Sequence, residues 1–461
     1  MSDFPDDACR CFRKVVNHKG AADMKYMINS GSPAANVVLC LVTMLSLSCM
    51  QTKDETRPKD GSLNNQTASF IYNAIPGDEA ATITPGYNTA VNSFAVKLLH
   101  ALCSSDSLLN KNLIVSPLNI SRNLAIVTEA AEGETKQELL TALGGQEALD
   151  GAKNALAELL YADNTVILQI ADAIWVNSSL YELIPSYITL AESNYGVYST
   201  SLDFTNNGNT VTTVNRWIED NTAHNIKGMI NETFIHPLTA CFITSAIYFR
   251  ADWASPFDIS KTTTQSFSTP SGIASVTMMV SDDYFQTVVT DTYCNARLYY
   301  GTGRKNYFFI DLYMPVGQSI TDFLQEQCPD VLGGGDSIEY RSVHMPKFVF
   351  ENTLDLSSAL KDIGINQAFS RNTSKITGMA VWKNSGAPAE LYIDTIVHSA
   401  GIRTDEEGTE AYAVTVTAVS GKGVAPAEEI IFNKPFVYFI RAGENGLILF
   451  AGIMNNPNER S

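Results

Sequence analysis

The sequence lacks the short motifs that mark the common enzyme classes. It has no GxSxG nucleophile elbow, no HExxH zinc motif, no P-loop, no Rossmann glycine fingerprint and no EF-hand loop. The six histidines are scattered, and no two carboxylates can be placed in a common site from the sequence. We therefore predict that the protein is not an enzyme and that it uses neither a cofactor nor a metal.

Basic residues are also scarce. The chain has 31 Lys and Arg against 49 Asp and Glu, and the formal net charge of −18 argues against binding nucleic acid or anionic lipid through a broad basic patch. No apolar run is long enough for a transmembrane helix. Eight cysteines without a CxxC pair exclude a dense disulfide scaffold and a zinc ribbon. With 461 residues, 45% of them hydrophobic, the chain can still bury a large core.

Residues 1–49 are predicted to be a leader. The stretch 34–48, AANVVLCLVTMLSLS, has the length and polarity of a signal-peptide core, and a small residue precedes Cys49. This resembles a bacterial lipoprotein cleavage site, although Leu45 lies one position further from Cys49 than is usual, and a buried core helix is the alternative. We expect acylation of Cys49 and a flexible tether over residues 50–86. The chain would then be exported and lipid-anchored at the bacterial outer membrane or cell surface, or otherwise secreted.

Residues 87–458 are interpreted as one α+β domain without an internal linker. Ser116 and Pro117 predict a helix start, because serine caps a helix and proline suits its first turn. Helical and strand patterns come in separate runs rather than in βαβ alternation, which favours the α+β class. Further helices are predicted at 214–230 and 354–360, strands at 165–176, 242–249 and 307–314, and a hairpin at 436–441 and 447–454.

The most informative segment is 404–431, TDEEGTEAYAVTVTAVSGKGVAPAEEII. With the two-residue period of a strand, Thr409 and Ala411 begin a face of uniformly small residues, whereas Glu410 and Tyr412 begin a bulkier face. A strand with one small face could enter an existing sheet without overpacking it. The SGKG that follows is flexible, so a strand-forming segment lies beside a protease-accessible loop. An ordinary edge strand is the alternative.

The stretch that begins at Glu406, EEGTEAYAVT, resembles the EEGTEAAAAT hinge of the serpins (serine protease inhibitors). Five other stretches resemble serpin motifs in the same order: NLIVSPLNI at 112–120, IYFRADWASPF at 247–257, HMPKF at 344–348, FNKPF at 432–436 and FAGIMNNP at 450–457. The resemblance covers about residues 87–458. It implies a single serpin-like domain with three β-sheets, eight or nine helices and an exposed C-terminal reactive loop.

The resemblance also implies inhibition by suicide-substrate trapping. The target endopeptidase cleaves the reactive loop, and the cleaved loop inserts into the main sheet and distorts the bound enzyme. We expect a monomer that traps serine endopeptidases, trypsin-like ones first and elastase-like ones second, with cysteine endopeptidases as a further option. Small hinge residues favour this interpretation over a non-inhibitory serpin that acts as a binding or carrier protein, which remains the alternative.

Three sets of residues take their roles from the resemblance. The hinge, which must thread between two strands, comprises Glu406, Glu407, Gly408, Thr409, Glu410, Ala411, Tyr412 and Ala413. The breach, at the upper end of the main sheet, comprises Lys347, Glu406 and Trp253. The shutter, beneath the sheet, comprises Ser116, Asn119, Ser245 and His398. We expect a Lys347–Glu406 ion pair at the breach and a hydrogen-bonded cluster of Asn119, Ser245 and His398 at the shutter.

The reactive bond is predicted at Lys422–Gly423. Lys422 is the seventeenth residue counted from Glu406, which is the spacing that the resemblance implies, and it is the only basic residue between Arg403 and Lys434. A trypsin-like pocket with an acid at its base would bind the ammonium group. Counting backward from FNKPF ends near Val424 instead, and Val424–Ala425 would suit an elastase-like enzyme.

Overall fold

The structure is a computed structural model that describes residues 84–159, 166–222, 224–281, 283, 285–301, 307–326, 328, 339–409 and 428–460. All of them lie in one compact unit, Ser69–Ser461. None of the helices within these ranges is long and apolar enough to cross a membrane. The described α-helices are α4 (Pro85–Cys103), α5 (Pro117–Ala130), α6 (Gly133–Leu143), α7 (Gln146–Leu159), α8 (Pro185–Tyr195), α9 (Asn207–Asn221), α10 (Ile320–Glu326) and α12 (Ser357–Asp362).

The N-termini of α4 and α5 are each capped by a polar side chain. The Thr84 side chain accepts a hydrogen bond from the backbone N–H of Tyr87, so α4 begins at Pro85, two residues before the predicted domain boundary. Ser116 caps α5 in the same way and Pro117 follows it, as the sequence predicts. Every residue of α5 except Glu129 is buried or nearly so, because this helix lies beneath the main sheet.

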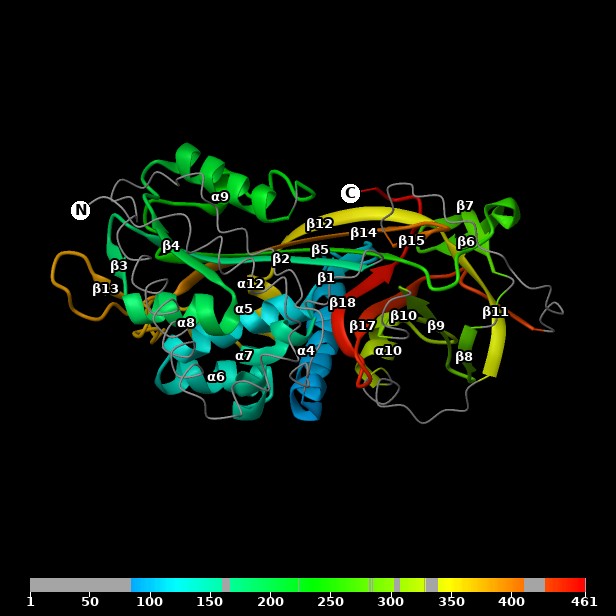
Figure 1. Cartoon of the computed structure of the whole chain (residues 1–461), viewed down its shortest axis with the longest axis horizontal. Helices are drawn as coiled ribbons and strands as arrows, with labels where there is room; N and C mark the ends of the chain where they lie inside the picture. The colour runs from blue at the N-terminus through cyan, green and yellow to red at the C-terminus, as the bar shows by residue number, and fades with distance from the viewer. Residues whose placement is uncertain are drawn as a thin grey trace, which may run out of the picture. The chain divides into compact units, whose positions relative to one another are not determined.

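The main sheet has six strands in the order β12-β14-β15-β5-β2-β4. Their bounds are β2 Val166–Asn177, β4 Tyr198–Leu202, β5 Cys241–Asp252, β12 Phe348–Asp355, β14 Ile393–Thr404 and β15 Gly408–Thr409. In the lower part of the sheet β14 pairs directly with β5 in parallel, whereas β15 lies between them at the upper end. Figure 1 shows α9 on one face, here called outer, and α4 to α8 on the other, called inner.

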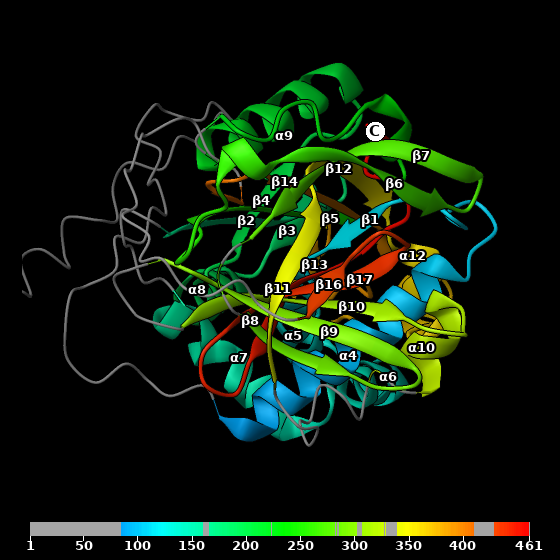
Figure 2. The ribbon, with the colours of Figure 1, turned by 90° about the vertical axis from the view of Figure 1, so that its right-hand side faces the viewer.

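Two further sheets share strand β11 (Glu339–Pro346). Its first residues pair with β8 (Phe285–Val289) and its last with β7 (Gly272–Val280). The other strands are β1 Leu113–Val115, β6 Thr263–Thr269, β9 Tyr293–Tyr300, β10 Phe308–Pro315, β16 Glu429–Ile431, β17 Phe436–Ala442 and β18 Leu447–Met454. Because β11 joins them edge to edge, the two form one continuous ten-stranded assembly (Figure 2). A small ribbon of β3 (Tyr181–Leu183) and β13 (Ala380–Trp382) is separate. The mixed α/β architecture with three sheets agrees with the prediction.

Two predicted helices are displaced along the chain. The one predicted at 354–360 is α12, Ser357–Asp362, and Leu354 and Asp355 are the last residues of β12. The apolar spacing of residues 214–230 predicts a helix there, but α9 spans Asn207–Asn221 and the chain after it is not helical. The Asn215 side chain explains the difference, because its amide donates to the Ile230 carbonyl at 2.8 Å and its oxygen accepts from the Ile230 N–H at 2.9 Å. These two bonds fix the backbone at Ile230 beside α9. The apolar residues Met229 and Ile230 therefore pack into the same core as α9 without being helical.

Candidate functional site

A short strand, β15, begins at the upper end of the main sheet. Thr409 pairs with Thr404 of β14 on one side and with Ala251 of β5 on the other. A Cβ atom at position 408 would lie 2.2 Å from the Ala251 carbonyl oxygen, so only glycine can approach β5 this closely. The Tyr300 and Thr409 hydroxyls are 2.6 Å apart and share a hydrogen bond, which fixes the last described hinge residue.

Lys347 and Glu406 form an ion pair beside β15. Lys347 Nζ lies 2.5 Å from Glu406 Oε2, and the Thr262 hydroxyl donates to Oε1 at 2.7 Å. The Glu406 side chain is only 8% exposed, whereas that of Lys347 is 34% exposed. Burial raises the pKa of Glu406, but the hydrogen bonds from Lys347 and Thr262 outweigh it and hold the pKa below its usual value. The carboxylate is therefore ionised in the folded protein.

Trp253 ties the turn before β15 to the end of β5. Its indole N–H donates to the Asp405 carbonyl at 2.8 Å, and its backbone N–H donates to the Glu407 carbonyl at 2.8 Å. The indole also stacks on Tyr300, with ring centroids 4.5 Å apart and an interplanar angle of 11°. The structure thus brings all three predicted breach residues to the point where the hinge enters the main sheet.

At the shutter, Ser116 and His398 are joined directly. The Ser116 backbone N–H donates to His398 Nε2 at 3.0 Å, and the Ser116 hydroxyl donates to the Leu449 carbonyl at 2.7 Å. His398 is fully buried, and this burial lowers the pKa of its imidazole to about 3. The ring is therefore neutral at ordinary pH, which is the form that can accept the bond from Ser116.

The other two shutter residues lie at the same level of the main sheet. Ser245 of β5 is directly opposite His398 of β14, and the Asn119 amide lies 3.5 Å from the Ala246 carbonyl oxygen. Within the described part of the chain, no hydrogen bond joins the side chains of Asn119, Ser245 and His398 to one another. The four predicted residues come together, but through backbone contacts rather than through the predicted bonds among three side chains.

Sequence reasoning misses a buried ion pair next to the shutter. Arg122 Nη1 of α5 lies 3.0 Å from Asp172 Oδ2 of β2, and both side chains are 0% exposed. Arg122 also donates to the carbonyl of Tyr195, and Asp172 lies opposite Ser245 across the β2–β5 pair. A signal was present, because Asp172 is the lone charge within the apolar run VILQIADAIWV and Arg122 is the only charged residue between Lys111 and Glu129. Such a charge requires a partner when it is buried.

Several predicted residues lie outside the described ranges. They are Glu410, Ala411, Tyr412 and Ala413 of the hinge, the two candidate reactive bonds Lys422–Gly423 and Val424–Ala425, and Cys49. The described chain resumes at Glu428, and β16 then pairs in parallel with β11. Arg341 of β11 donates from Nε to Glu428 Oε2 at 2.9 Å. The described residues that flank segment 410–427 therefore lead to different sheets, with Thr409 in the main sheet and β16 paired with β11.

The domain has three sheets, and in the main sheet the short strand β15 lies between the parallel strands β14 and β5. This arrangement defines the serpin class. The family model Serpin (serine protease inhibitor) matches residues 89–457, so this chain belongs to the serpin family. Serpins are generally inhibitors rather than catalysts.

Individual relatives agree with this assignment. Iripin-5 of Ixodes ricinus is 30% identical over 390 residues, which cover 80% of this chain and 94% of that protein. The solved structure of Serpin48, described as a highly specific serpin of the insect Tenebrio molitor, has a TM-score of 0.69 and 25% identity and covers 81% of this chain and 98% of its own. The solved structure of human thyroxine-binding globulin in complex with thyroxine has a TM-score of 0.70 and 24% identity, and the match covers 81% of this chain and 100% of that one. At this identity the likeness is evidence for a shared fold only.

Proposed function

We propose that this serpin inhibits serine endopeptidases as a suicide substrate. The observation that carries the proposal is β15, which already occupies the first positions of an additional strand between β14 and β5. After the endopeptidase has cleaved segment 410–427 and formed an acyl-enzyme, the cleaved segment continues β15 down the sheet. The new strand gains ladder hydrogen bonds and apolar burial, and the bound enzyme loses its catalytic geometry before water completes hydrolysis.

The hinge chemistry supports inhibition over a carrier role. Gly408 and Thr409 fit the narrow opening beside Ala251, and the residues that share the inner face with Thr409 in the sequence, Ala411 and Ala413, are equally small. Small side chains allow fast insertion because they overpack no neighbour. A non-inhibitory binding protein of the same fold would be cleaved in this segment without trapping the enzyme, so the same experiment separates the two functions.

We assign the reactive bond to Lys422–Gly423 and the preferred target to trypsin-like enzymes. Lys422 is the only base between Arg403 and Lys434, and its glycine neighbours permit the extended backbone that a protease binds. The bond Val424–Ala425, attacked by an elastase-like enzyme, is the second candidate.

Incubation with trypsin followed by denaturing gel electrophoresis tests the proposal. We expect a covalent complex that survives denaturation and a released fragment that begins at Gly423. Lys422→Ala should abolish trypsin trapping, while the matched control Lys434→Ala, at the next basic position, should trap trypsin as the wild type does. Cleavage without any complex would contradict inhibition, and full trapping of trypsin by Lys422→Ala would contradict the assigned bond.

We further propose that Cys49 carries a lipid that anchors the monomeric inhibitor to a bacterial membrane. The apolar stretch 34–48 directly ahead of Cys49 supports this proposal. Expression in a bacterial host with radiolabelled palmitate should label the wild type and leave Cys49→Ser unlabelled. Equal labelling of the two, or of neither, would contradict lipidation at this residue.

A further inference from the structure

The register of β14 and β5 is the same with and without a strand between them. At the upper end Thr409 links Thr404 to Ala251, an offset of 404 − 251 = 153 positions. In the lower part, where the two strands pair directly, Ala400 is opposite Ile247, and 400 − 247 is again 153. A strand that continues β15 downward therefore needs no sliding of either neighbour, and each of its residues has defined partners.

These partners follow from counting along the two strands. Each step beyond Thr409 moves one residue back on both neighbours, so an inserted Glu410 lies between Arg250 and Arg403. Two steps further, Tyr412 lies between Tyr248 and Gly401. Side chains directly opposite each other in a sheet project from the same face. Arg403 and Gly401 are exposed and Tyr248 is half-buried, so both inserted side chains project from the outer face.

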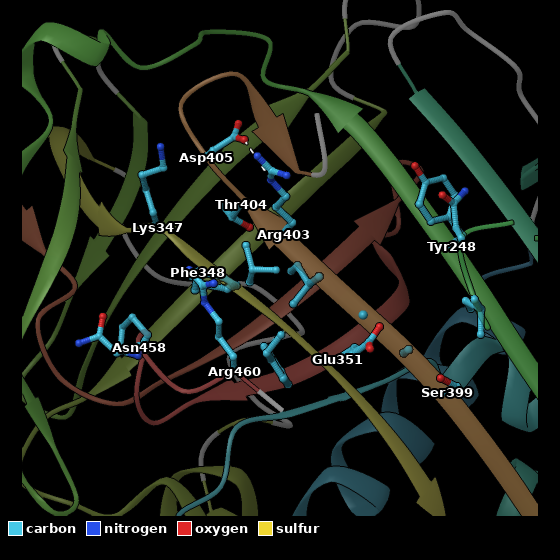
Figure 3. Close-up of a pocket in the computed structure, with 18 of the residues that line it drawn as sticks. Tyr248, Lys347, Phe348, Glu351, Ser399, Arg403, Thr404, Asp405, Asn458 and Arg460 are labelled. Carbon is cyan, nitrogen blue, oxygen red and sulfur yellow. Dashed lines mark ion pairs between the residues drawn. The ribbon is translucent and has the colours of Figure 1, made fainter. Parts of the chain in front are cut away.

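The outer face carries a pocket at this place (Figure 3). Its volume is about 820 Å³, and its lining includes Tyr248, Glu351, Ser399, Gly401 and Arg403. Figure 3 shows Tyr248 on β5 across from the β14 residues Ser399 and Arg403. The pocket extends over β14 because position 401 has no side chain, and a Cβ there would already lie 3.2 Å from the Glu351 Cβ.

We propose that this outer-face pocket is the receptor for residues 410–412 of the chain itself after loop cleavage. Tyr412 lies over Gly401 beside the Tyr248 ring, and the Glu410 carboxylate lies between the two guanidinium groups. Arg403 is available for this contact because its present partner, Asp405, is 3.5 Å away and the Arg403 side chain is 46% exposed. The inference rests on the proposed function, since it requires insertion, and it names the residues of this chain that recognise the inserted strand.

The pocket also accounts for the one bulky residue in the hinge. The serpin motif has alanine at the position of Tyr412, and an inward tyrosine would overpack the core between Ile402 and Ile247. An outward tyrosine instead covers apolar surface of its neighbours and adds a ring contact with Tyr248. Tyr412 is thus a positioning residue for insertion rather than an obstacle to it.

The stability of the cleaved form tests the proposal. Wild type and Tyr412→Ala are each cleaved in segment 410–427 by an endopeptidase that is not trapped, and both are unfolded in guanidinium beside their uncleaved forms. We expect Tyr412→Ala to lower the midpoint of the cleaved form by about 0.3 M and to leave the uncleaved midpoint unchanged. An equal loss in both forms, or no loss in either, overturns the inference.

A second pair of variants tests the charge contact. Glu410→Arg should destabilise the cleaved form, and Arg403→Glu in the same chain should restore part of the loss, because the pair is then reversed. Glu444→Arg is the matched control: Glu444 is exposed in the turn between β17 and β18, outside the main sheet, so its change should leave the difference between cleaved and uncleaved forms intact. Additive losses without any rescue overturn the contact.

These outcomes are distinguishable from failure of the proposed function. If the wild type gains no stability on cleavage and the intact wild type traps no trypsin, insertion does not occur. The proposed function then fails together with this inference. If wild type traps trypsin and is stabilised by cleavage while Tyr412→Ala and Glu410→Arg behave as wild type, the function stands and only the pocket assignment is wrong.

Discussion

The carboxylate of Glu406 uses both of its oxygens, one for Lys347 and one for Thr262. Reversing its charge would leave Lys347 facing a second cation in a half-buried place, and we expect Glu406→Lys to cost about 3 kcal/mol of the free energy of unfolding. An upper end opened in this way could accept the loop of another molecule. Native gel electrophoresis after mild heating should therefore show polymers for Glu406→Lys.

The exposed neighbour supplies the control for this variant. Glu407→Lys introduces the same charge one residue away, and Glu407 forms no ion pair among the described residues, so this variant should stay monomeric under the same heating. A monomeric Glu406→Lys with normal inhibition would show that the ion pair does not hold the hinge.

His398 makes the stability of the uncleaved protein depend on pH. The unfolded chain binds a proton at this residue near pH 6.5, whereas in the folded protein its pKa is about 3. The contribution of His398 to the free energy of unfolding should therefore fall by roughly 1 kcal/mol per pH unit as the pH drops from about 6 toward 3. Urea unfolding between pH 7 and 4 measures this slope. His398→Gln should flatten it.

At the level of elements, strands were easier to predict than side-chain partners. The apolar runs that become β2, β10 and the β17–β18 hairpin are long and lie between polar turns, so their positions agree with the prediction within a few residues. The end of α9 depends on the Asn215 side chain, and no periodicity carries that information. The breach followed from family resemblance, while the bonding at the shutter depends on backbone groups that are brought together only by the fold.

The Arg122–Asp172 pair joins α5 to β2 beneath the main sheet. Removing one member leaves a charge buried without its partner, so Arg122→Met should cost about 3–5 kcal/mol in the free energy of unfolding. Replacing both, with Arg122→Met and Asp172→Leu, should recover most of that loss, because no charge then remains buried. Guanidinium unfolding of the uncleaved variants measures both values.

The exposed Lys111–Glu459 pair is the matched comparison, because its side chains are 58% and 31% exposed. Lys111→Met should change the free energy of unfolding by less than about 0.5 kcal/mol. A double variant of Arg122 and Asp172 that is as unstable as Arg122→Met alone would show that packing, not charge, sets the cost.

For the whole molecule, insertion should alter one sheet and spare the assembly around β11. Hydrogen exchange should slow in the upper halves of β5 and β14 after loop cleavage, because their facing backbone groups gain a strand as partner. Exchange in β17 and β18 should stay as it was, since every pairing of that hairpin is already present. Equal slowing in both regions would indicate general compaction rather than insertion, and mass spectrometry of peptic fragments distinguishes these results.

The placement of the four tryptophans has an optical consequence. Trp175 of β2 and Trp217 of α9 are buried against each other, with ring centroids 5.5 Å apart, and Trp382 is 41% exposed on the β13 ribbon. Trp253 alone touches the turn that leads into the hinge. A change in the colour or intensity of the protein's own ultraviolet emission during proteolytic attack would therefore come chiefly from Trp253. The molecule carries a built-in fluorophore at the place where its conformational change begins, so that change can be timed without attaching a dye.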